Sequence, residues 1–128
     1  MSVDTSMQVL IVDDYPAMIR IIRGFLNQFG FRNVDECFDG KSAWDRAKTG
    51  SYGLIISDWN MSPMTGYELL QKVRAEPRTE ETPFIMITAE SKTDYVVMAK
   101  KAGVSNYIVK PFNASTLREK MRAVLGDF

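Results

Sequence analysis

The chain has 128 residues, of which 45% are hydrophobic and 25% are charged. This length and composition predict one folded domain with a real core, and they exclude two full domains and a disordered chain. Sixteen basic residues balance sixteen acidic ones, so no overall field favours nucleic acid or an anionic membrane. The sequence lacks histidine, which excludes histidine-based catalysis and histidine-ligated zinc, and its one cysteine, Cys37, excludes an internal disulfide.

The start of the chain carries no sign of export or membrane insertion. Residues 1–6 have neither the basic nor the apolar region of a secretory signal. No apolar run approaches the ~18 residues that a membrane span needs. Because a single cysteine also suits a reducing compartment, we expect a cytoplasmic protein without a membrane partner.

Short apolar runs alternate with amphipathic segments along the chain. The runs show no polar alternation, which predicts strands covered on both faces, whereas the segments between them have the period of a helix. In chain order we expect a strand at 9–12, a helix from Pro16 that closes at Gly30, an edge strand with two acidic residues at 34–38, a helix at 41–49, a strand at 54–56, a helix at 66–75, a strand at 84–87, a helix at 92–102, a strand at 107–109 and a helix at 114–125 capped by Asn113.

This alternation predicts an α/β fold in which a five-stranded parallel sheet is doubly wound, with helices on both faces. Sheets of this kind bind ligands beyond the carboxyl ends of their strands. We therefore expect the functional residues at that edge.

Polar residues follow four of the predicted strands at this edge. The first strand ends in Asp13-Asp14, the third in Asp58, the fourth in Thr88 and the fifth in Lys110. Carboxylates that lie close together repel one another by ~1 kcal/mol or more per pair, so the cluster needs a compensating cation. Because only oxygen ligands are available, Mg²⁺ is favoured over zinc, with Mn²⁺ as an alternative.

Each of these residues also has an ordinary structural explanation. Asp14 could cap the helix that begins at Pro16, and Asp58 could open a loop. Lys110 could be a solvated lysine and Thr88 an ordinary strand-end residue. Because all of these residues are expected at the same edge of the sheet, a functional site is favoured over separate structural roles.

Four motifs in this order are typical of one protein family. They are Asp13-Asp14, Ser57-Asp58-Trp59-Asn60-Met61, Thr88-Ala89-Glu90 and Tyr107-Ile108-Val109-Lys110-Pro111-Phe112. With these motifs the chain resembles the receiver domain of bacterial two-component response regulators, and among these the chemotaxis receivers of the CheY type. The resemblance covers essentially the whole chain. It implies a flavodoxin-like strand order 2-1-3-4-5 and a single receiver domain over residues 1–128 without an effector domain.

The resemblance implies that Asp58 is a phosphoacceptor, which takes its phosphoryl group from a phosphohistidine on a sensor histidine kinase. Asp14, Asp58 and the backbone carbonyl of Asn60 would hold Mg²⁺ directly, with Asp13 acting through a water molecule. Such a protein is not an enzyme with a separate substrate, although it catalyses its own phosphorylation and dephosphorylation.

Further roles follow from the same resemblance. Lys110 would contact the phosphoryl group, and Thr88 would turn its hydroxyl toward it. That movement would leave space for Tyr107, so that Thr88 and Tyr107 form a switch. Asn60 and Glu90 would tune the rate of dephosphorylation.

The partners implied are a chemotaxis kinase, the flagellar motor switch protein and a phosphatase, with the chain itself a monomer. Residues 92–128 carry seven basic and three acidic residues, and the resemblance places the target-binding surface on this segment. The alternative function is a receiver that serves another phosphorelay as phosphoryl shuttle or phosphate sink. A flavin carrier fits less well because Asp13-Asp14 would repel the flavin phosphate. An aspartate-nucleophile phosphatase also fits less well, because it would carry two aspartates separated by one residue after the first strand, whereas Asp13 and Asp14 are adjacent.

Some positions depart from the family pattern or carry local expectations. Ser62-Pro63 and Thr65 differ from the family, which leaves the shape of the loop after the third strand open. The family holds the Lys110-Pro111 bond cis, but the sequence alone favours a trans proline that ends a strand. We expect Trp59 to be half exposed beside the site and Trp44 to lie in the core.

Overall fold

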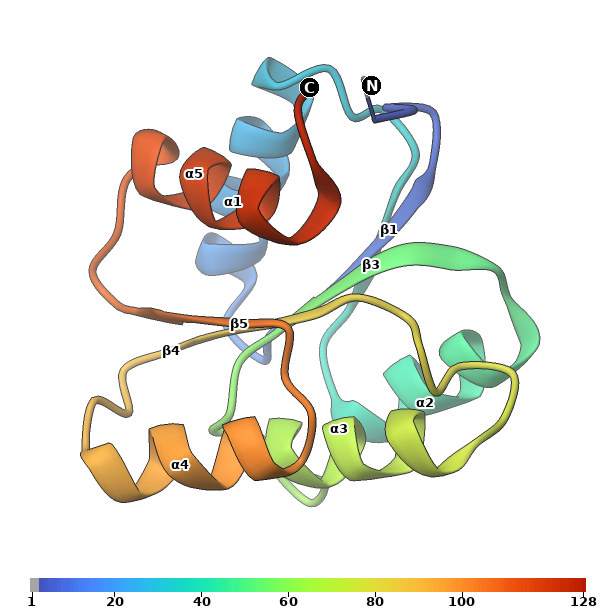
Figure 1. The fold of residues 1–128 in the computed structure, drawn as a ribbon, viewed down its shortest axis with the longest axis vertical. Helices are drawn as coiled ribbons and strands as arrows, with labels where there is room; N and C mark the ends of the chain where they lie inside the picture. Colours follow the sequence, from blue (N-terminus) through green and yellow to red (C-terminus); the bar gives the residue numbers. More distant parts are fainter. Residues whose placement is uncertain (1–2) are drawn as a thin grey trace.

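Five parallel strands form one sheet that helices cover on both faces (Figure 1). The computed structural model describes residues 3–128. Its elements are β1 (Gln8–Val12), α1 (Pro16–Gln28), β2 (Val34–Cys37), α2 (Gly40–Thr49), β3 (Tyr52–Ser57), α3 (Gly66–Ala75), β4 (Phe84–Thr88), α4 (Thr93–Lys101), β5 (Asn106–Val109) and α5 (Ala114–Leu125). The predicted α/β class and order of elements are confirmed, and the predicted ends agree within two residues.

The strands lie in the order 2-1-3-4-5, and every neighbouring pair is parallel. β2 lies at the edge, as its acidic residues predict, and Glu36 of β2 forms an ion pair of 2.6 Å with Arg23 of α1. The chain leaves β1 toward β2 on one side and returns to β3 on the other. The carboxyl ends of β1 and β3 therefore flank the switch point at which such sheets bind ligands.

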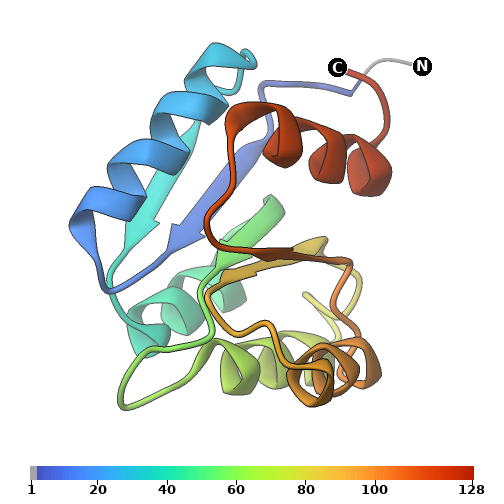
Figure 2. The same cartoon turned by 90° about the vertical axis from the view of Figure 1, so that its left-hand side faces the viewer.

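The sheet separates two hydrophobic layers. Figures 1 and 2 show α1 and α5 on one face of the sheet and α2, α3 and α4 on the other. Val9 and Ile11 of β1 pack in the first layer, whereas Leu10 and Val12 pack in the second. Both faces of the strand are thus buried, which explains why its sequence shows no polar alternation.

The start of α3 fixes the loop that follows β3. The Thr65 hydroxyl accepts a hydrogen bond from the Glu68 N–H at 3.1 Å, and Glu68 Oε1 accepts one from the Thr65 N–H at 3.0 Å. This reciprocal pair is a capping box. Thr65, one of the departures from the family pattern, therefore acts as the helix cap.

Other helix ends agree with the sequence as well. Asn113 caps α5, where its side chain accepts a hydrogen bond from the Thr116 N–H at 2.8 Å. No helix within residues 3–128 is long and apolar enough to cross a membrane.

Candidate phosphoacceptor and metal site

Three carboxylates meet at the carboxyl edge of the sheet, where β1 and β3 are neighbours. Asp13 and Asp14 follow β1, and Asp58 follows β3. One carboxylate oxygen from each residue lies within 4.8 Å of those from the other two. Asp13 and Asp58 are buried, with 2% and 8% of their surface exposed, whereas Asp14 faces solvent. The strand order thus brings together the acidic residues that the sequence analysis singled out.

The backbone around Asp58 orients its side chain. Asp58 Oδ1 accepts hydrogen bonds from the N–H of Trp59 at 2.6 Å and the N–H of Asn60 at 3.2 Å. The Asp58 N–H donates to the carbonyl of Val12 on β1 at 3.0 Å. The local turn therefore occupies Oδ1 and leaves Oδ2 directed toward Lys110.

Lys110 reaches the cluster from the end of β5. Its Nζ lies 3.2 Å from Asp13 Oδ2 and 3.1 Å from Asp58 Oδ2. Burial lowers the pKa of the Lys110 ammonium, but the two carboxylates raise it by more, so the pKa lies above its usual value. Lys110 is therefore charged, and it bridges the two buried carboxylates. The explanation of Lys110 as a solvated surface residue is wrong.

Burial of the ionised Asp13 carboxylate is unfavourable for folding. Burial raises the pKa of its carboxyl group, and the hydrogen bond from the Tyr15 N–H at 2.9 Å and the charge of Lys110 offset this only in part. The cap residue of α1 is Tyr15, and no side chain makes a cap hydrogen bond there. The explanation of Asp14 as a helix cap is therefore wrong too.

The charge and the donor atoms of the cluster fit a divalent cation. One ammonium group cannot balance three carboxylates, so the fully ionised cluster keeps two formal negative charges. All the carboxylate donors are oxygen atoms, which Mg²⁺ prefers. Asp13, Asp14 and Asp58 are thus the side chains that could hold the ion.

A second group of contacts lies beside the cluster and centres on Glu90. The Asn60 Nδ2 donates to Glu90 Oε1 at 3.1 Å, and the Tyr107 hydroxyl donates to the Glu90 carbonyl at 2.7 Å. Burial, followed by the charges of Glu90 and Asp58, raises the pKa of Tyr107 to about 12. Sequence reasoning paired Asn60 with Glu90 by role, but it missed the contact between Tyr107 and Glu90, which no local pattern signals.

Thr88 ends β4 and is fully buried. Its hydroxyl accepts a hydrogen bond from the Glu90 N–H at 3.3 Å, and its carbonyl accepts one from the Lys110 N–H at 2.8 Å. In this structure the Thr88 hydroxyl therefore bonds to the loop after β4. Through these two hydrogen bonds, Thr88 links that loop to Lys110.

Comparison with known proteins identifies the family to which this arrangement belongs. Residues 9–122 match the model of the response regulator receiver domain. The chain belongs to this family. The strand order and the acidic edge described above are thus those of a receiver domain.

Relatives of this receiver domain include chemotaxis proteins. It is 44% identical to the chemotaxis protein CheY of Pseudomonas aeruginosa over 118 residues, which cover 92% of this chain and 95% of the relative. It is also 44% identical to the chemotaxis protein CheY-3 of Vibrio cholerae over 116 residues, which cover 91% of this chain and 89% of that protein.

Solved structures agree with the fold of this receiver domain. The V. cholerae chemotaxis protein CheY4, crystallised at low pH, superposes with a TM-score of 0.86 at 34% identity, over 93% of this chain and 98% of that one. The receiver domain of a P. aeruginosa sensor histidine kinase superposes with a TM-score of 0.86 at 26% identity, over 95% and 99% of the two chains. That structure holds a magnesium ion coordinated in its active site cleft.

Three further expectations are wrong, two about tryptophans and one about a proline bond. Trp59 is buried, with 6% of its surface exposed, whereas Trp44 is only partly buried. Trp59 stacks on Tyr67 of α3 at 5.1 Å between ring centroids and meets the edge of Tyr95 of α4 at 5.0 Å. These aromatic rings come from two helices, so only the tertiary structure brings them over Trp59.

The third of these expectations concerns proline. The Lys110-Pro111 peptide bond is cis, and the Ser62-Pro63 bond is cis as well. A peptide bond before proline can be cis because it is a tertiary amide, in which the cis and trans isomers are close in energy.

Proposed function

We propose that this chain is a cytoplasmic response regulator that accepts a phosphoryl group on Asp58 from a sensor histidine kinase. The observation that carries the proposal is the bridge from Lys110 to Asp13 and Asp58 inside a buried acidic cluster. This bridge puts a cation beside a carboxylate oxygen whose partner oxygen is already fixed by backbone N–H groups. Phosphoryl transfer needs such a positioned nucleophile and positive charge near the equatorial oxygens.

The transfer would proceed by attack of an Asp58 carboxylate oxygen on phosphorus. The new O–P bond forms as the P–N bond to the kinase histidine breaks, and the electron pair returns to the imidazole nitrogen, which takes up a proton. Lys110 faces the charge on the transferred group. The partner supplies the histidine that this chain lacks.

The acidic cluster would hold Mg²⁺, or Mn²⁺, through Asp14, Asp58 and the backbone carbonyl of Asn60, with Asp13 acting through a water molecule. The bound ion would offset the charge of the phosphoryl oxygens beside the carboxylates. The magnesium ion in the cleft of the related kinase receiver supports this assignment. The ion pairs of Lys110 also support it, because one ammonium group neutralises only one of the three carboxylates and leaves the cluster negatively charged.

Loss of the phosphoryl group would return the protein to its resting state: water attacks phosphorus, the bond from phosphorus to the Asp58 oxygen breaks, and inorganic phosphate leaves while Asp58 regains its carboxylate. Asn60 is exposed and hydrogen bonded to Glu90 beside the site. We assign these two residues a role in setting the access of that water. In this sense the protein catalyses its own phosphorylation and dephosphorylation and has no separate substrate.

The output surface would be the face formed by α4, β5 and α5. Two of these elements expose large apolar side chains, Val97 and Met98 on α4 and Val109 on β5, and α4 ends in the basic residues Lys100 and Lys101. An acidic or amphipathic segment of a partner fits that combination. The chemotaxis relatives support the flagellar motor switch protein as the partner, with a chemotaxis kinase and a phosphatase acting on Asp58.

A second candidate function is a phosphoryl shuttle or phosphate sink in another phosphorelay. The likeness to a receiver domain that belongs to a sensor histidine kinase favours it. The two functions differ in output, because only the first requires phosphorylation to increase binding to a motor protein.

Mass spectrometry tests the phosphoacceptor directly. Incubation with acetyl phosphate and Mg²⁺ is expected to add one phosphoryl group to the wild type and none to Asp58→Asn. Asp94→Asn is the matched control, because Asp94 is an exposed carboxylate on α4 outside the site. Equal labelling of Asp58→Asn and the wild type would disprove the assignment.

A further inference from the structure

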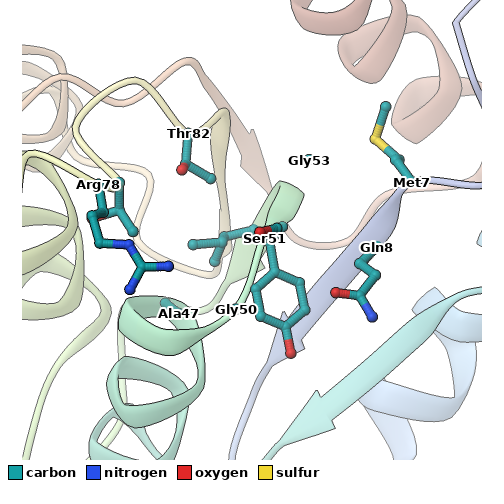
Figure 3. Close-up of a pocket in the computed structure, with 11 residues that line it drawn as sticks. Met7, Gln8, Ala47, Gly50, Ser51, Gly53, Arg78 and Thr82 are labelled. Carbon is teal, nitrogen blue, oxygen red and sulfur yellow. The ribbon is translucent and has the colours of Figure 1, made fainter.

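A cleft opens at the amino-terminal edge of the sheet, opposite the edge that carries the acidic cluster. Its volume is about 450 Å³, which is within the range of small-molecule sites. Figure 3 shows Arg78 and Thr82 on one side of the cleft, Met7 and Gln8 on the other, and Ser51 between them. The walls come from the start of β1, the turn into β3 and the loop between α3 and β4, and Ala47 of α2 lines the cleft as well.

An irregularity in β3 shapes this cleft. Gln8 of β1 lies opposite Tyr52, but the next residue of β1 lies opposite Leu54, so Gly53 is an extra residue in β3. Such bulges are rare between parallel strands, and they redirect side chains at the edges of sheets. A Cβ atom at Gly53 would lie 2.6 Å from the Sδ of Met7. Glycine at this position thus lets Met7 form a wall of the cleft.

The cleft carries one charged group, which is positive. Arg78 is the one charged side chain among the described residues that line it. Three glutamates share the loop of Arg78, namely Glu76, Glu80 and Glu81, but they do not line the cleft. Within residues 3–128, no carboxylate lies within 4.0 Å of the Arg78 guanidinium.

A second guanidinium adds positive charge at the same loop. Arg74 of α3 donates to the carbonyl of Thr82 at 2.6 Å and to the carbonyl of Gly103 at 2.9 Å. It too forms no ion pair among the residues that the structure describes. Thr82 therefore lies between a fixed guanidinium and the cleft, which makes this wall favourable for an anion.

The remaining lining is neutral, and part of it is apolar. Gln8, Ser51 and Thr82 offer an amide and two hydroxyl groups. Met7 and the Tyr52 ring offer apolar surface, and the Tyr52 hydroxyl is already bonded to Asp35 at 2.6 Å. This bond fixes the ring and removes its polar end from competition for a ligand.

We propose that this cleft binds a small organic carboxylate. The carboxylate would pair with the Arg78 guanidinium, whose planar fork matches two carboxylate oxygens. The apolar body of the ligand would lie against Met7 and the Tyr52 ring. The site is independent of the acidic cluster, so it does not depend on the function proposed for Asp58.

Benzoate is a suitable probe, because it combines a carboxylate with a flat apolar ring. The ¹⁵N-labelled protein is titrated in a chloride buffer free of divalent cations and of other organic anions. We expect saturable shifts of the backbone amide signals of Gly50, Ser51, Gly53 and Thr82. Benzamide, which has the same shape without the charge, is expected to bind at least fivefold more weakly.

Two variants locate the carboxylate. Arg78→Gln, at an exposed loop position, is expected to weaken benzoate binding at least fivefold. Arg32→Gln is the matched control, because Arg32 is also exposed and outside the cleft, and its affinity should stay within twofold of the wild type. Ser51→Phe, which fills the cleft from an exposed position, should abolish the shifts.

Three results would each overturn the proposal. They are equal affinity for benzamide and benzoate, unchanged affinity in Arg78→Gln, and shifts confined to amides around Asp58 and Lys110. The last result would mean that benzoate binds only at the acidic edge.

Discussion

Among single residues, Lys110 supplies the positive charge of the acidic edge. It follows β5, yet it contacts carboxylates that follow β1 and β3. Removal of one partner of a buried ion pair leaves an uncompensated charge, which is more costly than the pair itself is stabilising. Lys110 therefore offsets part of the repulsion within the cluster by pairing with Asp13 and Asp58.

Asp13→Asn is expected to stabilise the metal-free protein at neutral pH. Burial raises the pKa of Asp13, so the unfolded chain ionises at a lower pH than the folded one, and stability falls as pH rises from ~4 through the folded pKa. Asparagine removes this loss and keeps an oxygen that can accept the Tyr15 N–H. Lys110 keeps Asp58 as its ion-pair partner, so the substitution leaves no uncompensated buried charge. Thermal melts between pH 3.5 and 8 without metal should give a larger advantage of the variant at pH 7 than at pH 3.5. An advantage that does not depend on pH would contradict this explanation.

Added Mg²⁺ should reverse that order. A ligand that binds only the folded state stabilises it by roughly 2.7 kcal/mol at a hundredfold excess over Kd. The wild type should gain this stability, whereas Asp13→Asn, which lacks one charge of the cluster, should gain less. The melting temperature is measured against Mg²⁺ concentration with Na⁺ at equal ionic strength as the control. A wild-type melting temperature that Mg²⁺ leaves unchanged would argue against a metal site.

Among the elements, the junction between β3 and α3 depends on one glycine. A Cβ at Gly66 would lie 1.8 Å from the carbonyl oxygen of Asp58, which is closer than two such atoms can approach. The first turn of α3 therefore packs directly on the backbone of the loop that carries Asp58. The capping box of Thr65 and Glu68 also stabilises this first turn of α3.

Gly66→Ala is expected to destabilise the protein by ~1–3 kcal/mol or more, because the extra methyl group forces the backbone of the Asp58 loop to move. Gly24→Ala is the matched control. Gly24 is exposed within α1, and a Cβ there would meet nothing within 4 Å. This second change should stabilise the protein by ~0.5–1 kcal/mol, because alanine is the better helix former.

Urea denaturation measures both glycine variants, and phosphorylation by acetyl phosphate gives a second readout. Gly66→Ala should also lower the rate of Asp58 phosphorylation, whereas Gly24→Ala should not. Equal effects of the two substitutions on stability would mean that the close contact at Gly66 does not constrain the loop.

In the whole molecule, contacts around Glu90 connect the acidic edge to the proposed output surface. Tyr107 belongs to β5, and its hydroxyl is bonded to the backbone of the loop after β4. Thr88 is bonded to the same loop through the Glu90 N–H. A movement of Thr88 toward a phosphoryl group on Asp58 would therefore disturb the loop that holds Tyr107. Two discrete packings of this region would give a partner two states to distinguish.

Tyr107→Ala is expected to leave phosphorylation of Asp58 nearly intact while it weakens phosphorylation-dependent binding of the partner. A shift of the population from 1:99 to 99:1 requires ~5.5 kcal/mol of difference between the two states, so loss of one side chain that distinguishes them should be measurable. Titration of a motor switch protein with and without phosphorylation gives the two affinities. Tyr107→Phe, which removes only the hydrogen bond to Glu90, separates the contribution of the hydroxyl from that of the ring.

The switch would be disproved by a wild-type affinity that phosphorylation does not change, or by a Tyr107→Ala variant that retains the full increase. A protein that is phosphorylated on Asp58 but never binds the motor protein more tightly would favour the phosphate-sink function.

The sequence by itself determined the order of elements and the edge at which the site lies. Buried strands and amphipathic helices leave local signals, namely apolar runs without alternation and a 3.6-residue period. Caps such as Asn113 and the two acidic residues of the edge strand are also local features. In a parallel sheet, all carboxyl ends meet at one edge, so the position of Asp13, Asp14 and Asp58 follows once the strands are assigned.

Only the tertiary structure decided which groups touch at that edge. The bridge from Lys110 to Asp13 joins residues 97 positions apart, and the contact of Tyr107 with Glu90 joins residues 17 apart. The burial of Trp59 likewise depends on rings from α3 and α4. These contacts depend on the packing of separate elements, and local sequence patterns contain no information about distances between side chains that are far apart in the chain.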